Sequence, residues 1–420
     1  MSTNWGGGHA SPSATRLSAG ARQSSLRESN LALVARTVCA SSTPVSRAGV
    51  AARTAMTRST VSRLVDDLVA AGVLAEIEPS SVTGPGRPAT PLAPGTALAA
   101  LGLQVNTSYL AARLVDLSGR VVAQRVEYDD LVGCEAAPTL ARLGELSRQV
   151  LAEGRGIRLV GAGLALPGIV SSSSGRLLRA PNLGWSDLVP AEHLAEHLDE
   201  HLDEHLDATG GSPLRVGNEA DLAALTVALA APGRPGRLAD FVYLSGEIGI
   251  GGAAVLDGRV MAGRHGWAGE VGHVCVDPDG PGCRCGSTGC LEQYAGRQAL
   301  LAAAGLPPGT APAQFAQEAR SGPGPARDAV ARAAWALGIA LAGVVNVLDI
   351  PAIVLGGHLG QVADLLRPDL ERQLRRRVLS ARWVVPTIEA ADGDPAPGAT
   401  GAALHELAAV VDDPARWVGA

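Results

Sequence analysis

Apolar residues recur at helical spacing in three segments near the N-terminus. The first segment spans residues 29–41, and the next two lie within residues 46–71, on either side of a tight turn around Thr54 to Thr57. Ser46 and Thr57 precede these two helices and are residue types that cap a helix N-terminus. The last helix carries an inward apolar stripe, formed by Val61, Leu64, Val65 and Leu68. This pattern predicts a small unit of three helices.

The face opposite this stripe is polar. Near the helix N-terminus it carries short hydroxyl side chains and arginines: Arg58, Ser59, Thr60, Ser62 and Arg63. A recognition helix presents such side chains to base edges and phosphates in the major groove of DNA. The chain continues to residue 95 as strand, Gly/Pro-rich tip and strand, which is typical of a wing, and Arg87 at the tip suits a minor groove. We therefore predict a winged helix-turn-helix DNA-binding domain over residues 26–95. A helical bundle used only for packing is the alternative.

The segments on either side of this domain predict its boundaries. Residues 1–25 are rich in Ser and Gly and predict a disordered tail, and "PLAPG" at residues 91–95 predicts a linker. From residue 96 onward, apolar strands alternate with Ala/Leu-rich helices, which indicates an α/β fold. Two strands run into glycine clusters at residues 246–252 and 356–360. Glycines allow backbone N–H groups to approach a phosphate closely, although they are also common in ordinary turns.

A predicted hairpin at residues 101–120 has a polar tip without glycine. The tip consists of Asn106, Thr107 and Ser108. Strand–tip–strand hairpins that hold nucleotide phosphates usually use glycines, because side chains obstruct the approach of phosphate to the backbone. From the residues alone, a working phosphate loop, a degenerate one and an ordinary hairpin all remain open.

Composition and charge narrow the possible functions. The chain has 420 residues, enough for two or three domains, and its 35 basic residues are all arginine. The absence of lysine excludes a Walker A loop and a Schiff base. Residues 1–95 hold nine Arg against five acidic residues, whereas the remainder holds 26 against 36. This basic N-terminal part favours an anionic partner such as DNA. No apolar run approaches the roughly 20 residues of a membrane span, and no signal peptide precedes the fold, so we expect a cytoplasmic protein without a membrane partner.

One loop has the spacing of a metal site. It extends from residue 273 to residue 290 and contains His273, Cys283, Cys285 and Cys290 in the pattern H-x9-C-x-C-x4-C. An imidazole and three thiolates suit tetrahedral Zn²⁺, and four protein ligands leave no open position, so we predict a structural ion. Disulfides are the less favoured use of these cysteines in a cytosolic protein. Cys39, Cys134 and Cys275 have no partner at ligand spacing and are predicted to be ordinary thiols.

Several motifs together resemble one protein family. The stretches "AGEVGH" and "CRCGSTGCLE", downstream of a winged helix, resemble the ROK family of repressors, open reading frames and kinases. The resemblance extends over about residues 27–410 and includes "APNLGW", "GNEADLAAL" and "GIGGAAVLDG". It implies two actin-like, ribonuclease H-like α/β lobes over residues 96–420, with a sugar and nucleotide cleft between them. Kinases of the family phosphorylate hexoses or N-acetylated hexoses. Repressors of the xylose and N-acetylglucosamine type keep this body, add the winged helix and sense a sugar.

The resemblance also implies a set of sugar-binding residues. They are Asn182, Asn218, Glu219, Glu270, His273 and Glu292. Carboxylates and amides at fixed positions can accept hydrogen bonds from, and donate them to, a ring of hydroxyls. A zinc-bound histidine keeps its second ring nitrogen for a hydrogen bond, so His273 would couple the metal to the sugar. Asn182 and Asn218 can alternatively serve only as caps of turns.

The two predicted phosphate loops depart from the motifs that kinases of the family carry at these positions. In the first loop, the family's acid, two glycines, threonine and lysine align with Gln104, Asn106, Thr107, Ser108 and Tyr109. In the second loop, Glu247 and Ile248 replace a glycine and a threonine, and Glu219 stands where the kinases have their catalytic aspartate. A neutral glutamine organises Mg²⁺ poorly, and a carboxylate repels a triphosphate. We therefore expect no catalytic residues, no phosphoryl transfer and no bound ATP.

These observations predict a sugar-responsive transcriptional regulator, most simply a repressor. It would bind a double-stranded operator as a homodimer or a dimer of dimers, with a small sugar as effector and one structural Zn²⁺. One alternative is an ATP-dependent sugar kinase with a fused DNA-binding head. Another is a corepressor whose cleft binds a protein partner instead of a sugar.

Overall fold

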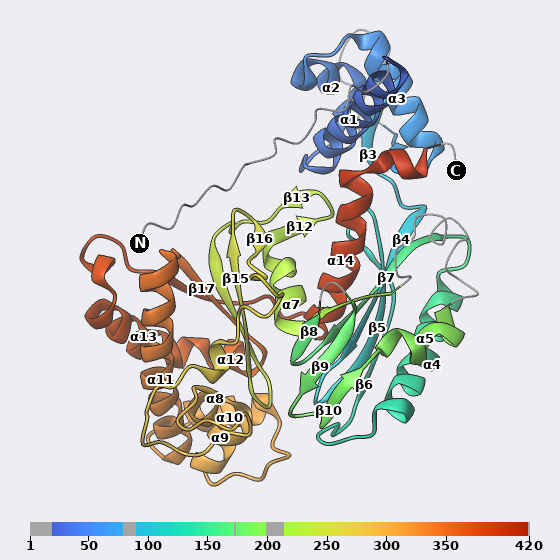
Figure 1. Cartoon of the computed structure of the whole chain (residues 1–420). Coiled ribbons are helices and arrows are strands. Elements are labelled where there is room, and N and C mark those ends of the chain that lie inside the picture. Colours follow the sequence, from blue (N-terminus) through green and yellow to red (C-terminus); the bar gives the residue numbers. More distant parts are fainter. Residues whose placement is uncertain (1–18, 79–89, 172–173, 199–213, 419–420) are drawn as a thin grey trace, which may run out of the picture.

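The N-terminal part of the chain forms a head of three helices, at the top of Figure 1. The computed structural model describes residues 19–78, 90–171, 174–198 and 214–418. The head helices are α1 (Ala19–Cys39), α2 (Arg47–Thr54) and α3 (Arg58–Ala70). Oγ of Ser46 accepts the N–H of Gly49 at 3.1 Å, and Oγ1 of Thr57 accepts that of Thr60 at 3.2 Å. Both predicted N-caps are therefore confirmed.

Two boundaries of the head differ from the prediction. Helix α1 begins at Ala19, inside the segment predicted to be a tail, because no proline and no further glycine interrupts the sequence after Gly20. The predicted linker at residues 91–95 is wrong, since β3 (Pro91–Pro94) is the central strand between β1 (Val45–Ser46) and β2 (Leu74–Glu76). Leu92 is fully buried. Proline has no backbone N–H to donate, but its carbonyl can still accept, and the carbonyl of Pro91 accepts the N–H of Ile77 at 3.0 Å. The wing tip with Arg87 lies outside the described residues.

The head shares a hydrophobic core with the C-terminal helix. In one buried cluster, Val34 and Val38 of α1 join Leu407 and Val410 of α14 (Pro397–Asp412). Around this cluster, Arg36 Nε donates to Asp412 Oδ1 at 2.9 Å, and the guanidinium of Arg158 lies 5.2 Å from the ring centroid of Trp417. In Figure 1, α14 runs from the head down between the two halves of the body, so the head is anchored to that helix.

The body consists of two lobes that repeat one sheet topology. The first sheet contains, from one edge to the other, β11 (Leu214–Asn218), β7 (Arg158–Leu166), β4 (Leu98–Val105), β5 (Tyr109–Asp116) and β6 (Val121–Tyr128). The second sheet contains β18 (Thr387–Ala390), β17 (Ala352–Gly356), β14 (Phe241–Gly246), β15 (Ile250–Leu256) and β16 (Arg259–Val260). In each sheet, three strands pair antiparallel and the other two add in parallel. This duplication is the arrangement that the family resemblance implies.

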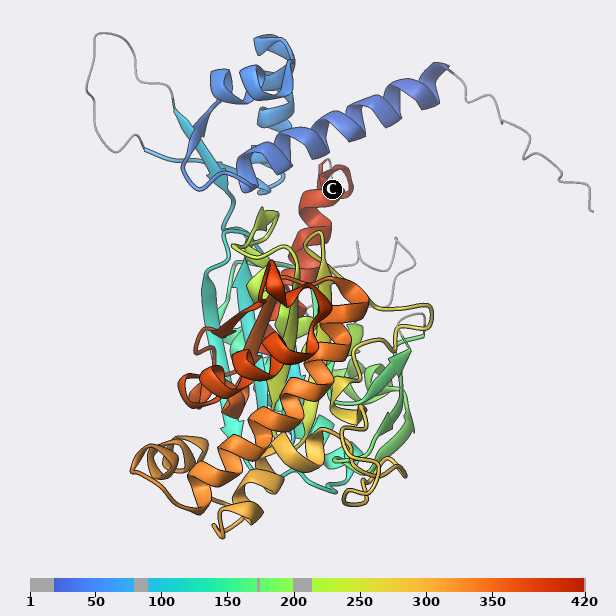
Figure 2. The ribbon, with the colours of Figure 1, turned by 90° about the vertical axis from the view of Figure 1, so that its left-hand side faces the viewer.

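Helices cover both faces of each sheet. The first sheet packs α4 (Ala136–Glu153) on its outer face, with α5 (Pro190–Leu198) against α4, and α14 on the face toward the second lobe. The second sheet packs α7 (Glu219–Ala228) on its inner face and α11 (Pro325–Leu348) and α13 (Ala363–Arg377) outside, as Figures 1 and 2 show. The remaining elements are β8 (Ile169–Ser171), β9 (Arg176–Ala180), β10 (Trp185–Leu188), β12 (Leu229–Ala231), β13 (Arg234–Pro235), η1 (Val271–His273), α8 (Glu292–Ala295), α9 (Arg297–Ala303), α10 (Pro312–Arg320), α12 (Gly357–Gln361), η2 (Leu379–Arg382) and η3 (Pro414–Trp417).

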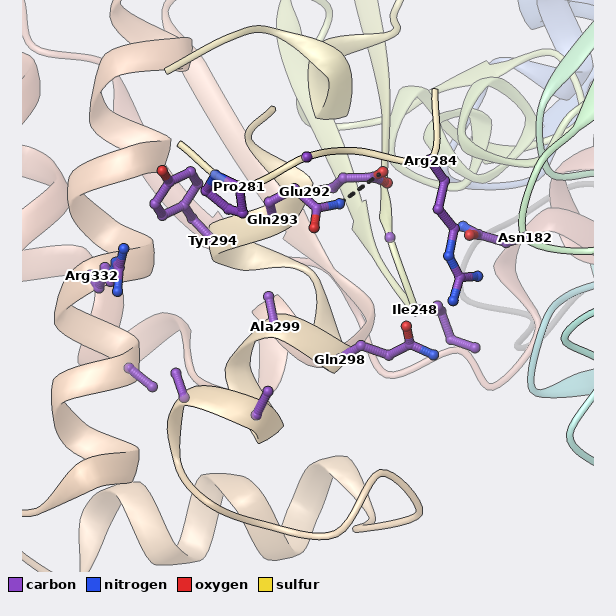
Figure 3. Close-up of a pocket in the computed structure, with 15 residues that line it drawn as sticks. Asn182, Ile248, Pro281, Arg284, Glu292, Gln293, Tyr294, Gln298, Ala299 and Arg332 are labelled. Carbon is purple, nitrogen blue, oxygen red and sulfur yellow. Dashed lines mark hydrogen bonds between the residues drawn. The ribbon is translucent and has the colours of Figure 1, made fainter. Parts of the chain in front are cut away.

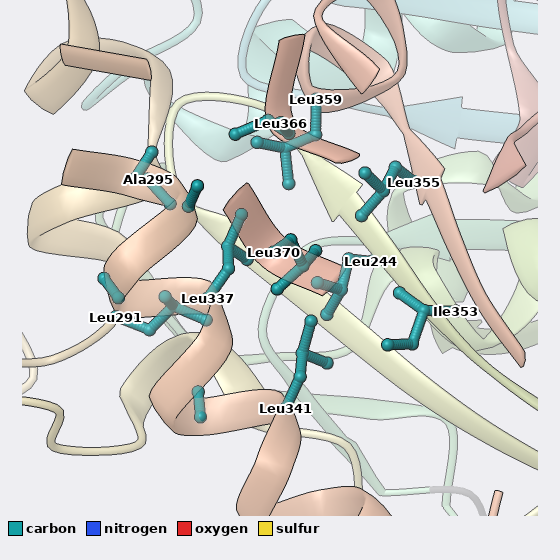
Figure 4. Packing of buried hydrophobic residues seen from close by; sticks show 14 of the residues in the cluster. Leu244, Leu291, Ala295, Leu337, Leu341, Ile353, Leu355, Leu359, Leu366 and Leu370 are labelled. Atoms are coloured by element: carbon teal, nitrogen blue, oxygen red, sulfur yellow. The ribbon is translucent and has the colours of Figure 1, made fainter. Parts of the chain in front are cut away.

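Strand residues of the second sheet alternate between two cores. Leu244 and Ile353 point outward to Leu337 and Leu341 of α11, as Figure 4 shows, while Tyr243 belongs to the cluster beneath α7. Because both faces are covered, these strands are nearly continuous apolar runs. The second sheet is therefore a rigid support for the loops at its ends.

Among the described residues, one helix is long and apolar enough to cross a membrane by length and composition. This helix is α11, and 56% of its apolar stretch is buried inside the fold. Arg327, Asp328 and Arg332 interrupt its first half. Helix α11 is therefore a core helix of the second lobe.

Candidate functional site

The six predicted sugar-binding residues line one cavity between the lobes. The first lobe contributes Asn182, which follows β9, and the segment from β11 into α7 contributes Asn218 and Glu219. The loop around η1 contributes Glu270 and His273, and Glu292 is the first residue of α8. The fold thus gathers residues that are up to 110 positions apart, from Asn182 to Glu292, around one space.

The two asparagines differ in what their side chains do. Oδ1 of Asn218 accepts the N–H of Ala220 at 2.7 Å as the N-cap of α7, and its Nδ2 donates to the carbonyl of Gly168 at 2.9 Å. The alternative role as a cap therefore applies to Asn218. The side chain of Asn182 has no hydrogen bond to any described residue, and it lies beside Gly249, where an added Cβ would be 3.2 Å from its Nδ2. Asn182 is therefore available to a ligand.

Glu219 is held by two residues of the degenerate first loop. Its Oε2 accepts Nδ2 of Asn106 at 2.9 Å and Nε2 of Gln104 at 3.3 Å. Burial raises the pKa of Glu219, and these two hydrogen bonds act in the opposite direction. The sequence analysis treated positions 104 and 106 only as losses of the kinase pattern. Gln104 lies near the end of β4 and Asn106 directly follows it, so a spacing of two at the strand end was the available signal for a shared partner.

In each of the two predicted degenerate phosphate loops, one backbone N–H group is used within the loop itself. Oδ1 of Asn106 accepts the N–H of Ser108 at 3.0 Å, and the N–H of Glu247 donates to the carbonyl of Gly249 at 3.0 Å. Beside these loops lies a cavity of about 870 Å³, lined by Tyr109, Tyr243 and Glu247 among others. Burial, followed by the charge of Glu219, raises the pKa of Glu247 to about 8. The cavity has room for a nucleotide, but its loops do not offer these amides to phosphates.

The four predicted metal ligands converge. One ligand atom from each of His273, Cys283, Cys285 and Cys290 lies within 4.8 Å of the others. Sγ of Cys285 is 3.7 Å from Sγ of Cys290, and Sγ of Cys283 is 3.8 Å from Nδ1 of His273. A tetrahedral ion with Zn–S distances of about 2.3 Å separates its sulfur ligands by ~3.8 Å, so the residues fit zinc.

The orientation of His273 places the metal site next to the sugar-type cavity. Its Nδ1 faces Cys283, while its Nε2 is 3.9 Å from Oε2 of Glu270. A metal held by Nδ1 would therefore leave Nε2 on the cavity side. Of the other cysteines, Cys39 is buried, Cys134 is half-buried and Cys275 is exposed.

One acidic residue near the site, which does not line the cavity itself, was not identified by the sequence analysis. Asp221 lies in the first turn of α7, and its Oδ1 is buried without a hydrogen-bond partner among the described residues. Burial, followed by the charge of Glu270, raises the pKa of Asp221 to about 7. A second acidic residue, two positions after Glu219 in the first turn of α7, was the available signal. Together with Glu270 and Glu292 it gives the region an excess of acceptors, which suits an uncharged ligand rich in hydroxyl donors.

Five of the six predicted DNA-binding residues lie on α3, but not all of these five are equally exposed. Arg58, Ser59 and Arg63 are exposed, whereas Thr60 and Ser62 are half-buried. Oγ1 of Thr60 lies 2.8 Å from Oγ1 of Thr57 and forms a hydrogen bond with it. The exposed polar face of the helix therefore centres on the two arginines.

Comparisons with known proteins agree with this architecture. The family model described as "ROK family" matches residues 144–408, more than half of the chain. The chain is 26% identical to a xylose repressor of Caldicellulosiruptor bescii, over 85% of this chain and 90% of that protein. It is 27% identical to a glucokinase of Streptomyces coelicolor, over 67% and 89% respectively.

Solved structures show the same fold. A ROK family transcriptional regulator, described as a homologue of the E. coli MLC protein, matches with a TM-score of 0.74 and 24% identity over 94% of this chain and 100% of that one. A ROK family glucokinase from Streptomyces griseus, in complex with glucose and AMPPNP, matches with a TM-score of 0.59 and 24% identity over 73% and 98%. The glucokinase match leaves about a quarter of this chain uncovered, whereas the regulator match extends over nearly all of it. Because the family model matches more than half of its residues, this chain belongs to the ROK family.

Proposed function

We propose that this protein is a sugar-responsive transcriptional repressor. The observation that carries the proposal is the presence, in one chain, of a head of three helices and a three-stranded sheet, and of an interlobe cavity lined by the six residues predicted to bind sugar. The likeness to a xylose repressor over 85% of the chain supports it. Two heads of a homodimer, or of a dimer of dimers, bind a pseudo-palindromic operator in the cytoplasm.

In this proposal the cavity recognises a neutral sugar through hydroxyl groups. Glu270, Glu292 and Glu219 accept hydrogen bonds from the hydroxyls, and the free amide of Asn182 donates one. A zinc ion held by His273, Cys283, Cys285 and Cys290 fixes the loop between Glu270 and Glu292, and it takes no part in chemistry. To release DNA, the sugar must prefer one lobe arrangement over the other by about 1–3 kcal/mol.

We further infer that the protein does not transfer phosphate. Asn106 and Gln104 both donate to Oε2 of Glu219, which lowers the basicity of that oxygen, and Asn106 also takes up the N–H of Ser108. Glu247 places a side chain in the wall of the larger cavity, at a position where the kinase pattern of the family has a glycine. These contacts favour a sensor over the kinase alternative. The many acceptors in the cavity favour a sugar over a protein partner.

Release of DNA by sugar tests the proposal directly. An operator selected from a random DNA pool should bind the protein tightly, and at least one of xylose, glucose and N-acetylglucosamine should weaken binding tenfold or more in a gel-shift titration. The variant Glu270→Ala should bind the operator normally and lose the response, while Glu318→Ala, an exposed glutamate on α10, should retain it. The sensing half of the proposal fails if no sugar alters operator affinity.

The arginines of α3 should carry the salt-dependent part of operator binding. Changing Arg58 and Arg63 together to alanine removes two cations from the exposed face of that helix. We expect roughly a 10- to 100-fold loss of operator affinity at 0.1 M salt, and a slope of log K against log salt that is smaller by about 2. Arg375→Ala, on α13, should change neither quantity. An unchanged slope in the double variant would place the DNA elsewhere.

ATP should not bind at millimolar concentration. Because the N–H groups of Ser108 and Glu247 are hydrogen-bonded within their own loops, isothermal titration with ATP and Mg²⁺ should give no heat of binding. A coupled ADP-release assay with glucose, N-acetylglucosamine and N-acetylmannosamine should show no turnover. Measurable turnover with any of them would restore the kinase alternative.

A further inference from the structure

A second cavity lies directly beside the sugar-type cavity. It has a volume of about 500 Å³, within the range of small-molecule sites. The two cavities share Asn182, Gly249, Arg284 and Glu292 in their walls, so they adjoin at these residues. Figure 3 shows Arg284 and Asn182 at one end of the second cavity, with Tyr294 and Arg332 at the other. A ligand seated among the sugar-site residues can therefore extend into it.

Polar atoms without protein partners face the junction of the cavities. An added Cβ at Gly249 would lie 2.4 Å from Oε2 of Glu292 and 3.2 Å from Nδ2 of Asn182, so only glycine leaves this passage open. Oε1 of Glu292 interacts with Cys283 and Gln293, but its Oε2 and the amide of Asn182 have no hydrogen bond to any described residue. The junction therefore presents an acceptor and an amide to a ligand that crosses it.

The second cavity has the chemistry of a sugar subsite. Its polar side chains are planar amides and guanidinium groups, from Gln293, Gln298, Arg284 and Arg332, and such groups pair with neighbouring hydroxyls. Arg284 and Gln298 have no hydrogen bond or ion pair within the described part of the chain. The floor consists of small side chains, from Ala299, Ala302, Ala303 and Ala329, which leave room for a ring. Glu292 is its only acidic residue, so the excess of acceptors found in the first cavity does not continue here.

We infer that the effector is a disaccharide or a longer glycoside, with one ring among the predicted sugar-binding residues and the next in the second cavity. The inference rests on the proposed sugar-sensing function and names its ligand class. A monosaccharide would leave the amides and guanidinium groups of the second cavity without ligand contacts. The second ring adds several hydrogen bonds, and a net gain of 1.4 kcal/mol from them corresponds to tenfold tighter binding.

Calorimetric titration of the full-length protein tests the inference. The probes are xylose, glucose and N-acetylglucosamine, and their β-1,4-linked dimers xylobiose, cellobiose and chitobiose. We expect at least one dimer to bind tenfold or more tightly than its own monosaccharide. Binding of a monosaccharide without tighter binding of any dimer overturns the inference and leaves the proposed function standing. Binding of no saccharide at all overturns both.

Variants locate the second ring. Ala299 is half-buried in α9 and lines only the second cavity, so Ala299→Trp should remove the tenfold advantage of the dimer while the affinity for the monosaccharide stays within about twofold. Ala313→Trp, an exposed alanine on α10 that lines neither cavity, is the matched control and should bind both sugars normally. If Ala299→Trp does not fold, Gln298→Leu removes one amide of the same cavity and should weaken only the dimer. Unchanged dimer affinity in a folded variant contradicts the placement.

Discussion

Replacing Cys285 by serine is expected to remove the bound metal and abolish the response to sugar. The change takes one thiolate from a set of four ligand atoms that lie within 4.8 Å of one another. Without the ion, the remaining thiolates and the imidazole have no common partner, and the loop from residue 273 to residue 290 loses its main constraint. We expect the free energy of unfolding to fall by roughly 3–5 kcal/mol, less than the whole binding energy of a structural zinc ion, because the lobes have their own cores.

We expect Cys285→Ser to weaken sugar binding as well, because it displaces two residues that line the sugar-type cavity. His273 is itself a predicted ligand, and Glu292 directly follows the loop, with Oε1 at 3.0 Å from Sγ of Cys283. Both line the sugar-type cavity, so a disordered loop displaces them together. Metal analysis, thermal unfolding and sugar titration should all change in Cys285→Ser.

Cys275→Ser provides a matched control for this experiment. Cys275 is exposed, lies two positions after His273 and takes no part in the cluster. This variant should keep about one ion per chain and respond to sugar normally. A wild-type protein with clearly less than one ion per chain, or a Cys285→Ser variant that retains the ion, would refute the zinc assignment.

The metal loop and the helix caps were predictable because their signals are local. The metal ligands are close together along one short loop, which limits which side chains can meet. The cap at Thr57 involves an N–H group only three residues further along the chain, that of Thr60. For residues 91–95 the sequence analysis predicted both the second strand of a wing and a linker, and only the strand is confirmed. Two prolines and a glycine indicate a linker locally, whereas the burial of Leu92 and its pairing with two other strands depend on tertiary contacts.

The residues that line the sugar-type cavity could be predicted from the sequence, but the hydrogen bonds of their side chains could not. Family motifs gathered the six residues, yet the sequence alone could not decide which asparagine was free, since both follow strands and both can cap turns. The structure separates them, because the side chain of Asn218 is used by Ala220 and Gly168 and that of Asn182 is not. Likewise, the partners of Gln104 lie 115 and 295 positions away, so no local pattern could reveal them.

A continuous set of contacts connects the cavity with the head through Gln104. This side chain is almost completely buried, and its Nε2 donates to Glu219 at 3.3 Å while its Oε1 accepts the N–H of Ala399 at 3.1 Å. Ala399 lies in the first turn of α14, whose 16 residues extend about 24 Å toward the head. There Leu407 and Val410 enter the core of the head. We therefore expect a sugar that moves Glu219 to shift α14, on which the head is anchored.

Replacing Gln104 by leucine should consequently separate sugar binding from DNA release. The leucine fills similar space but makes neither hydrogen bond, so Glu219 keeps only Asn106, and the N–H of Ala399 loses its partner at a cost of about 1–3 kcal/mol. We expect sugar affinity to change by less than about fivefold, whereas the effect of sugar on operator affinity should vanish. Calorimetric titration with the effector and gel shifts with and without it measure the two quantities separately.

The informative comparison is with Gln373→Leu. Gln373 packs against Gly338 in the outer helices of the second lobe, and its Oε1 has no hydrogen-bond partner among the described residues. The same exchange at this position therefore leaves the contacts from Glu219 through Gln104 to α14 unchanged. That variant should bind sugar and release the operator like the wild type. If Gln104→Leu also releases the operator normally, the coupling does not pass through this side chain. If it loses sugar binding as well, Gln104 acts within the site and not between the site and the head. Only retained binding with lost release identifies Gln104 as the connection, because coupling between two sites is a free-energy difference distinct from the affinity of either.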